Sequence, residues 1–333
     1  MATMKDVAQL AGVSTATVSR ALMNPEKVSS STRKRVEDAV LEAGYSPNSL
    51  ARNLRRNESK TIVAIVPDIC DPYFSEIIRG IEDAAMENGY LVLLGSGQQN
   101  KHDNTIVNHV FTKQADGMLL LGTDLPFDVS KSEQKNLPPM VMACEFAPEL
   151  ELPTIHIDNL TSAFEAVNYL TQLGHKRIAQ ISGPETAALC QFRQQGYQQA
   201  LRRAGIEKQE KYNVSAEFSL EGGVNAARKL LELSNPPTAL FCHSDTLAIG
   251  AIQEAKRLGF RVPQDLSIVG FDDIQFSQFC DPPLTTISQP RYEIGRQAVL
   301  MMLELLRGQE IHSGSRLLDT ELIIRSSTAQ PGR

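Results

Sequence analysis

The stretch TMKDVAQLAGVSTATVSRALMN, residues 3–24, decides how the rest of the sequence is interpreted. Apolar residues recur at helical spacing in its first half, where Thr3 and Asp6 form a capping box and Gly12 ends the helix. A second helix begins after a short turn, with Ser14 as its N-cap, and ends at an Asn-Pro pair. Two short helices joined by a glycine-containing turn predict a helix-turn-helix.

A third helix completes this N-terminal domain. Serines at 29–31 can cap it, and Gly44 followed by Pro47 closes it. Its buried face is predicted to consist of Val36, Ala39, Val40 and Ala43. We therefore expect an all-α helix-turn-helix DNA-binding domain at residues 1–47.

The second helix has polar residues outside its apolar face, near the N-terminus of the helix. This is where a recognition helix contacts base edges. Arg20, one of these residues, can form a bidentate pair with guanine, which is worth about 1–3 kcal/mol of discrimination. The DNA contacts expected in this domain are Thr3, Ser14, Thr15, Ala16, Thr17, Arg20, Asn24 and Tyr45. The helical pattern alone also fits a structural three-helix bundle with a solvated polar face, and it leaves that alternative open.

The distribution of charge separates this domain from the rest of the chain. The 333 residues have a net charge of -6, which by itself argues against a nucleic-acid partner. Residues 1–60, however, hold 10 Lys and Arg against 6 Asp and Glu, whereas the remaining residues hold 23 against 33. A small basic module on an acidic body is typical of a DNA-binding domain joined to a core that does not bind DNA.

Four short motifs resemble the signature of the LacI family of bacterial repressors: MKDVA at 4–8, GVS at 12–14, TVSR at 17–20 and GYSP at 44–47. The next segment, NSLARNLRR at 48–56, is similar to the hinge helix of that family. In the family this helix lies in the minor groove at the centre of the operator. The resemblance therefore implies a sequence-specific transcriptional repressor.

The same resemblance assigns roles within a hinge at residues 48–60. It implies that Leu54 is an apolar wedge between the central base pairs and that Ala51 lets two paired hinges approach closely. A wedge of this kind costs unstacking energy, which the wider contact with kinked DNA offsets. The DNA contacts expected here are Asn48, Ala51, Arg52, Leu54 and Arg55. Because about nine residues do not hold a helix alone in water, we expect disorder in the free protein and a helix on DNA.

From residue 61 onward, β-rich apolar runs alternate with helical stretches, and the second half repeats the rhythm of the first. Strands are expected at 61–67, 90–94, 117–121, 140–143, 154–157, 177–182, 212–216, 238–242, 266–271 and 317–324. This alternation predicts βαβ crossovers and parallel sheets covered by helices on both faces. We therefore expect an α/β periplasmic-binding-protein-like body of two doubly wound parallel-sheet subdomains at residues 61–333, which binds an effector and dimerises.

In open parallel sheets a ligand lies beyond the carboxyl ends of the strands, so polar and aromatic residues that follow the predicted strands are the candidates for effector binding. These candidates are Asp71, Tyr73, Phe74, Arg193, Phe218, Asp245 and Asp272. A carboxylate and a guanidinium can fix sugar hydroxyls, and flat aromatic rings can stack on a base, which favours a sugar or a nucleoside. Each candidate has a structural alternative, because Asp and Arg at strand ends often cap helices and Phe often fills a core. The family resemblance favours Arg193 and Asp272, which lie in motifs that carry the family's effector-contacting arginine and acid.

Three further segments resemble a nucleoside-responsive branch of the family: ICDPYF at 69–74, FAPELELP at 146–153 and QFCDPP at 278–283. This resemblance implies cytidine as the inducer, control of genes for nucleoside uptake and catabolism, and contact with the cyclic-AMP receptor protein at promoters. A purine base or a sugar is the alternative effector. Because helix-turn-helix domains bind paired half-sites, we also expect a homodimer on a near-palindromic operator.

Motifs of enzymes and metal sites are weak in this sequence. Ser31 and Lys34 have the spacing of a Ser-Lys nucleophile motif but open a helix, and the Gly95-Gly97 pair lacks the third glycine of a dinucleotide site. The six histidines show no paired ligand spacing, and the five cysteines are too dispersed for a zinc site. We therefore expect no enzymatic activity, no cofactor and no metal. The rival classes are a sugar- or nucleoside-processing enzyme with a helical head and a pure carrier, both of which would tolerate loss of residues 1–60.

The hydropathy pattern gives no sign of a membrane partner. No apolar run approaches the length of about 18 residues that crosses a bilayer. The N-terminus lacks the apolar stretch of a secretory signal. We therefore expect a cytoplasmic protein.

Overall fold

The computed structural model describes residues 2–45, 58–97, 114–122, 138–145, 152–309 and 314–332, together with residues 110, 112 and 311. The chain divides into two compact units, Met1–Ser59 and Lys60–Arg333, called unit 1 and unit 2 below. Most of the hinge expected at 48–60 lies outside the described residues. In the described ranges, no helix is both long enough and apolar enough to cross a bilayer.

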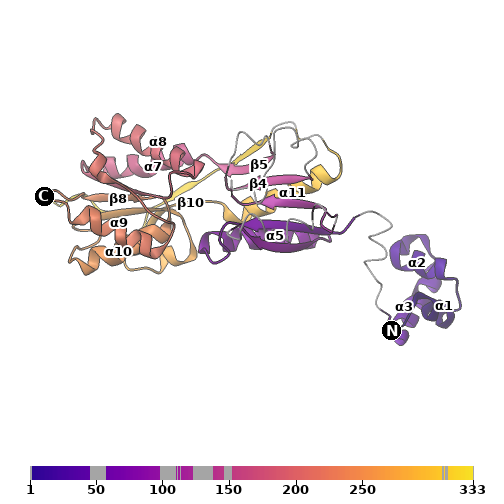
Figure 1. The fold of residues 1–333 in the computed structure, drawn as a ribbon. Coiled ribbons are helices and arrows are strands. Elements are labelled where there is room, and N and C mark those ends of the chain that lie inside the picture. Colours follow the sequence, from indigo (N-terminus) through magenta and orange to yellow (C-terminus); the bar gives the residue numbers. More distant parts are fainter. Residues whose placement is uncertain are drawn as a thin grey trace. The chain divides into compact units, whose positions relative to one another are not determined.

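Unit 1 is a three-helix domain in the predicted order (Figure 1). Its elements are α1 (Met4–Ala11), α2 (Thr15–Met23), the 3-10 turn η1 (Pro25–Lys27) and α3 (Ser30–Ala43). Helix α1 begins with the capping box, in which Thr3 and Asp6 bond reciprocally, and ends at Gly12 in the left-handed conformation, with a φ of 64°. Ser14 and Ser29 cap α2 and α3 through their side chains. The three predicted helices are confirmed.

Small side chains form the core of unit 1. Val7, Val18 and Val36, one from each helix, are fully buried and pack in one cluster with alanines of the same helices. Helices this short are marginal alone in water, so burial of their apolar faces stabilises them. The predicted face of α3 is buried at Val36 and Ala39, whereas Val40 is only partly buried.

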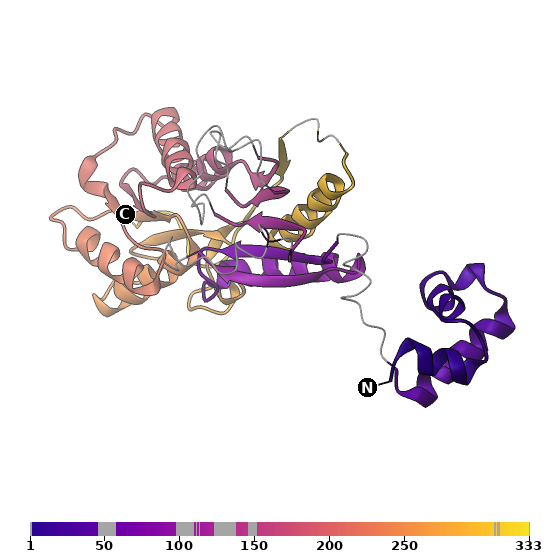
Figure 2. The same ribbon diagram turned by 45° about the vertical axis from the view of Figure 1, so that its right-hand side comes forward.

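Unit 2 contains two six-stranded sheets with helices packed against them (Figures 1 and 2). The first sheet has the order β11-β5-β4-β3-β1-β2, and all of its strand pairs are parallel. Its strands are β1 (Thr61–Val66), β2 (Leu91–Ser96), β3 (Gly117–Leu120), β4 (Met140–Ala143), β5 (Thr154–Ile157) and β11 (Ser315–Leu318). Its helices are α5 (Pro72–Glu87) and α11 (Arg291–Leu306). They pack so closely that a Cβ at Gly80 would lie 2.0 Å from the carbonyl oxygen of Tyr292, so this position requires glycine.

The second sheet has the order β12-β10-β9-β8-β6-β7. Its strands are β6 (Ile178–Ser182), β7 (Asn213–Ser215), β8 (Ala239–Cys242), β9 (Ser267–Asp272), β10 (Thr285–Ser288) and β12 (Glu321–Ile323). The helices around it are α7 (Asn159–Gln172), α8 (Ala188–Arg203), α9 (Leu220–Leu231) and α10 (Asp245–Arg257), with 3-10 turns η4 (Glu210–Tyr212) and η5 (Gln275–Gln278). Strand β12 pairs antiparallel with β10, so this sheet is parallel except at that edge.

The C-terminal third departs from the predicted strands in two ways. The run 317–324 is not one strand, because it contributes to β11 of the first sheet and to β12 of the second. Strand β10 was not predicted, since its buried side chains include Thr285 and Thr286 rather than a continuous apolar run. The hydroxyl of Thr286 donates to Asp245, which satisfies its polarity inside the sheet.

The chain passes between the two sheets three times, between β5 and α7, between β10 and α11, and between β11 and β12 (Figure 1). Residues that follow β1, β3 and β4 of the first sheet and β6, β7, β8 and β9 of the second line a single cavity. This arrangement agrees with the rule that ligands bind beyond the carboxyl ends of parallel strands.

Candidate functional site

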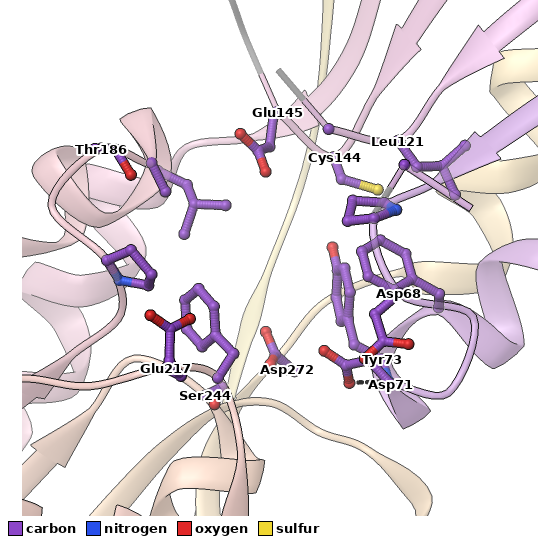
Figure 3. Close-up of a pocket in the computed structure, with 18 of the residues that line it drawn as sticks. Asp68, Asp71, Tyr73, Leu121, Cys144, Glu145, Thr186, Glu217, Ser244 and Asp272 are labelled. Atoms are coloured by element: carbon purple, nitrogen blue, oxygen red, sulfur yellow. Dashed lines mark hydrogen bonds between the residues drawn. The ribbon is translucent and has the colours of Figure 1, made fainter. Parts of the chain in front are cut away.

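A cavity of about 590 Å³ lies between the two sheets of unit 2 (Figure 3). The first sheet contributes Asp68, Asp71, Tyr73, Phe74, Cys144 and Glu145. The second sheet contributes Thr186, Arg193, Glu217, Phe218, Ser244 and Asp272. Its volume falls in the range of about 300–1,000 Å³ that is usual for small-molecule pockets. We call this cavity the cleft; it contains six of the seven predicted effector-binding residues.

Arg193 lies on the second-sheet wall of the cleft, with only 4% of its surface exposed. Its Nε donates to Asn159 Oδ1 at 2.8 Å, and its Nη1 donates to the carbonyl oxygen of His243. The guanidinium also lies 3.7 Å from the centre of the Phe271 ring. Its Nη2 is 3.9 Å from Asp272 Oδ1. These contacts fix the guanidinium plane with one nitrogen directed toward Asp272.

Asp272 ends β9 in a backbone conformation that L-residues rarely adopt. Its φ is 116°, and that of Asp273 is 54°. Two arginines hold the turn, because Arg325 donates to the Asp273 carboxylate at 2.7 Å and Arg291 to its carbonyl oxygen at 2.6 Å. Residues in such regions cost about 1–3 kcal/mol each and persist where the surroundings enforce them. Burial raises the pKa of Asp272, and the positive charge of Arg193 opposes this rise.

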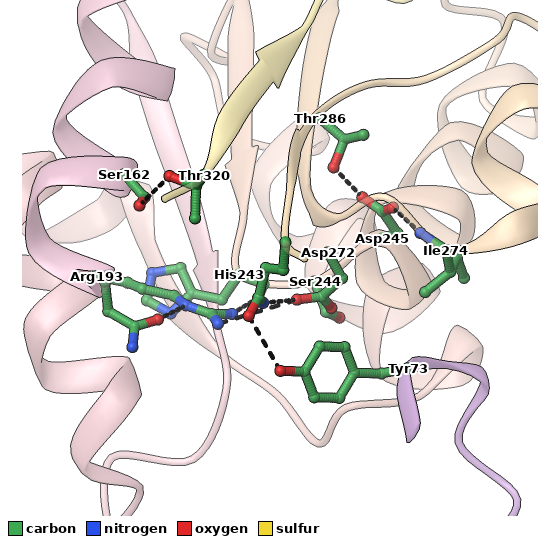
Figure 4. A network of polar contacts seen from close by, with 12 residues as sticks. Tyr73, Ser162, Arg193, His243, Ser244, Asp245, Asp272, Ile274, Thr286 and Thr320 are labelled. Carbon is green, nitrogen blue, oxygen red and sulfur yellow. Dashed lines mark hydrogen bonds and ion pairs between the residues drawn. The ribbon is translucent and has the colours of Figure 1, made fainter. Parts of the chain in front are cut away.

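A chain of hydrogen bonds connects the two walls of the cleft (Figure 4). The Tyr73 hydroxyl donates to Gln289 Oε1 at 3.0 Å, and Gln289 Nε2 donates to Asp272 Oδ1 at 2.7 Å. Tyr73 belongs to α5 of the first sheet, Asp272 ends β9 of the second, and Gln289 lies at the β10–α11 crossing. A ligand that bonds to Asp272 therefore contacts a network that reaches the other wall.

Asp71 has both a structural and a cleft-lining role. It is the N-cap of α5, where its Oδ1 accepts a hydrogen bond from the Tyr73 backbone at 3.0 Å. Burial raises the pKa of Asp71, and the nearby Asp68 carboxylate raises it further. Its side chain nevertheless lines the cleft beside Asp68.

Aromatic rings lie on both walls of the cleft. Tyr73 and Phe74 pack edge to face, with ring centroids 5.0 Å apart. Phe218 lies on the opposite wall, where it fills the space beside Gly183; a Cβ at Gly183 would lie 2.2 Å from the Phe218 ring. A flat ligand between these walls would have aromatic surface available on either side.

Asp245, the seventh effector-binding candidate, is not among the described residues that line the cleft. Its side chain is fully buried and accepts hydrogen bonds from the Ile274 backbone and from the hydroxyls of Ser277 and Thr286 (Figure 4). Burial raises its pKa to about 6. Asp245 therefore holds the loop after β9 against α10.

Three carboxylates of the cleft were missed by the sequence interpretation. Asp68 follows β1, Glu145 follows β4 and Glu217 follows β7, so the strand-end rule that identified their neighbours would also have found them. Cys144, beside Glu145, is buried, and burial raises the pKa of its thiol. It is therefore a protonated wall residue rather than a nucleophile.

The DNA-binding residues predicted in unit 1 fall into two groups. Thr15 and Ala16 are exposed in the first turn of α2, whereas Arg20 is exposed in its last turn rather than near its N-terminus as expected. The others have partners within the domain. Ser14 caps α2 by accepting a hydrogen bond from the Thr17 backbone, and Thr3 bonds to Asp6. Asn24 is the C-cap of α2, and Tyr45 packs against the core. Asn48, Ala51, Arg52, Leu54 and Arg55 lie outside the described residues.

Comparison with known proteins agrees with this architecture. Residues 3–48 match the family described as bacterial regulatory proteins, lacI family, and residues 167–328 match the periplasmic binding protein-like domain. The chain is 64% identical over 328 residues to the HTH-type transcriptional repressor CytR of Escherichia coli K12. The match covers 98% of this chain and 96% of that protein. It is 37% identical to the ribose operon repressor of Haemophilus influenzae, which covers 98% of each chain.

Solved structures of two regulators are similar to this chain. The lac repressor dimer bound to operator and the anti-inducer ONPF has a TM-score of 0.86 and 27% identity, covering 98% of this chain and 99% of that chain. The complex of the transcriptional regulator CelR with cellobiose has a TM-score of 0.75 and 30% identity, covering 98% of this chain and all of that chain.

A helix-turn-helix domain combined with a cleft between two α/β subdomains defines a DNA-binding transcriptional repressor that responds to an effector. The chain belongs to the LacI family of such regulators. Its relatives are transcriptional repressors rather than enzymes, which excludes the enzymatic alternative.

Proposed function

We propose that this repressor controls genes for nucleoside uptake and catabolism and that cytidine, bound in the cleft, is its inducer. One observation carries the proposal: the buried Arg193–Asp272 pair shares the cleft with aromatic rings from both walls. Ribose hydroxyls suit the carboxylate and the guanidinium, and a pyrimidine ring suits stacking on Phe74 or Phe218. A simple sugar lacks the planar base that would stack on these rings, and a purine base lacks the ribose hydroxyls that suit the charged pair.

The sequence relationship supports cytidine in particular. The segments at 69–74 and 278–283 resemble a nucleoside-responsive branch of the family, and the 64% identity to CytR extends over nearly the whole chain. Contact with the cyclic-AMP receptor protein at promoters is proposed on this relationship alone.

Effector binding would act on DNA affinity through the geometry of the cleft. A ligand that closes or twists the two walls would shift the first-sheet subdomain, to which the hinge at 48–60 is joined, so that paired hinges separate. The Tyr73–Gln289–Asp272 hydrogen bonds provide contacts that can differ between the two states. A ligand moves such an equilibrium only by its differential affinity, for which about 1–3 kcal/mol is typical.

The functional unit would be a homodimer on a near-palindromic operator. Large apolar side chains are exposed on unit 2, among them Leu91 at 73% and Phe279 at 74%, and a second copy would cover such surface. The similar lac repressor structure is a dimer bound to operator. In this dimer, Thr15, Ala16 and Arg20 would face the major groove, while the hinge residues Leu54 and Ala51 would enter the minor groove.

A calorimetric titration combined with an operator-binding assay tests the proposal. The full chain would be titrated with cytidine, adenosine, hypoxanthine and ribose, and its binding to promoter fragments of nucleoside genes would be measured with and without each compound. We expect cytidine to bind most tightly and to weaken operator binding about 5- to 150-fold. Tighter binding of a sugar or a purine base would refute cytidine as the inducer, and equal affinity for promoter and random DNA would refute the repressor assignment at these genes.

A further inference from the structure

The described residues that line the cleft carry a strong excess of negative charge. Their only cationic side chain is that of Arg193. The carboxylates among them are Asp68, Asp71, Glu145, Glu217 and Asp272. Figure 3 shows that these acids lie around the hollow rather than on one wall only. A ligand in the cleft is therefore surrounded by carboxyl groups from both walls.

Arg193, the single cation among the described residues of the cleft, already has partners within the chain. Arg193 bonds to Asn159 and to the His243 carbonyl group, stacks on the Phe271 ring and faces Asp272. A phosphate group that took this guanidinium would displace buried contacts and would lie against the Asp272 carboxylate. Arg193 therefore suits hydroxyl groups better than an anion.

Three of the acids lie without an ion pair where a ligand substituent could meet them. Asp68 and Asp71 follow β1 on one wall, and Glu217 follows β7 on the other. Across the described ranges, no lysine or arginine forms an ion pair with any of the three. Asp68 and Asp71 are close enough for the charge of one to raise the pKa of the other. Among the described residues, no cation therefore pairs with these carboxylates.

We infer that the cleft discriminates by charge, admitting a nucleoside and excluding the corresponding 5′-nucleotide, and that Asp68, Asp71 and Glu217 set this discrimination. The inference rests on the proposed nucleoside function and adds the chemical class that the cleft rejects. A nucleotide carries the same base and ribose as its nucleoside, so contacts to those groups do not separate them. A phosphate monoester carries a charge of about -1.5 to -2 at neutral pH. Each carboxylate within about 10 Å should weaken its binding roughly five- to tenfold after screening by salt.

Three ligands, two of them of similar size, separate the effect of charge from that of bulk. Cytidine, cytidine 5′-monophosphate and the neutral cytidine 5′-(dimethyl phosphate) would each be titrated calorimetrically into the full chain. We expect the monophosphate to bind at least about 100-fold more weakly than cytidine and the neutral triester to stay within about tenfold. A monophosphate that binds within tenfold of cytidine would overturn the inference, and so would a triester as weak as the monophosphate, because the exclusion would then be steric. Failure of cytidine itself to bind would overturn the proposed function and this inference with it.

Variants then test which residues discriminate. The double variant Asp71→Asn, Glu217→Gln keeps an N-cap on α5 and removes two charges, so it should improve monophosphate affinity at least tenfold relative to cytidine. Glu321→Gln removes an exposed carboxylate of β12 outside the cleft and should leave the ratio unchanged. In the parent protein, raising the salt concentration from about 0.05 to about 0.5 M should shorten the Debye length. The ratio of cytidine affinity to monophosphate affinity should therefore become smaller. A ratio that responds to neither treatment would refute the role of these residues.

Discussion

Unit 1 and unit 2 place their functional side chains in opposite environments. In unit 1, the candidate contacts Thr15, Ala16 and Arg20 are exposed along one helix of 9 residues. In unit 2, the polar network is buried and joins residues as distant in sequence as Tyr73 and Gln289, 216 positions apart. A surface site on one helix depends on local periodicity, whereas a cleft between two sheets depends on the whole topology. Substitutions in the two units should therefore have separable effects, which the following predictions test.

The largest effect is expected for Arg193→Ala in unit 2. The substitution leaves Asp272 buried without its cationic neighbour, and breaking a buried pair in this way costs about 3–5 kcal/mol. Effector affinity should fall below detection in a calorimetric titration, while the folded fraction still binds operator in a mobility-shift assay. Arg202→Ala, an exposed residue near the end of the same helix, is the matched control. Retained effector affinity in Arg193→Ala would remove this residue from the site.

The sequence predicted unit 1 more completely than unit 2 for a physical reason. The capping residues Thr3, Ser14 and Ser29 act within three residues of their partners, so local pattern determines them. Arg193 and Asp272 were among the candidates that follow predicted strands, and the family resemblance favoured both of them.

The strand-end rule is not sufficient where segments later in the chain decide which side chains remain accessible from the cleft. Asp245 follows β8 much as Asp272 ends β9, but Ser277 and Ile274 of the next loop cover it. Gln289 was missed because it follows β10, a strand whose buried threonines hide it from a hydropathy pattern. The sequence does not show which loop folds over which carboxylate, and only the tertiary structure supplies that information.

A smaller effect is expected for Arg20→Ala in unit 1. Arg20 is exposed in the last turn of α2, and loss of a bidentate contact with guanine costs about 1–3 kcal/mol. Operator affinity should fall by that amount in a fluorescence anisotropy titration, whereas effector affinity stays unchanged. Arg33→Ala, whose arginine forms an exposed ion pair with Glu37 on α3, should have a weaker effect on operator discrimination. An equal loss on operator and random DNA would show that Arg20 contacts phosphate rather than a base.

His243 should make unit 2 sensitive to acid in a way that unit 1 is not. The side chain is fully buried, and neither ring nitrogen has a hydrogen-bond partner among the described residues. Burial and the charge of Arg193 lower its pKa, so the folded state keeps it neutral while the unfolded state takes up a proton below about pH 6.5. Its contribution to stability is therefore present above pH 6.5 and is lost as the pH falls, by up to about 1.4 kcal/mol per unit.

Urea unfolding of the parent protein and of His243→Leu at pH 7.5, 6.5 and 5.5 measures this loss. Asp245, whose raised pKa of about 6 acts in the opposite direction, is present in both proteins and cancels in the comparison. The difference in unfolding free energy between the two proteins should change in favour of the variant as the pH falls. A difference independent of pH would mean that His243 is protonated in the folded state as readily as in the unfolded state.

The smallest effect is expected for Tyr73→Phe, which removes one hydroxyl and keeps the ring. The lost hydrogen bond to Gln289 is worth about 0.5–1.5 kcal/mol, equivalent to about 2- to 12-fold in an equilibrium. If this bond connects the walls, the ratio of operator affinities without and with effector should change by that factor, while effector affinity changes less. Tyr169→Phe is the matched control, because it removes a hydroxyl that bonds to Thr328 at 3.0 Å and does not line the cleft. An altered effector affinity with an unchanged ratio would instead make Tyr73 a ligand contact, and the coupling between the walls would then depend on other residues.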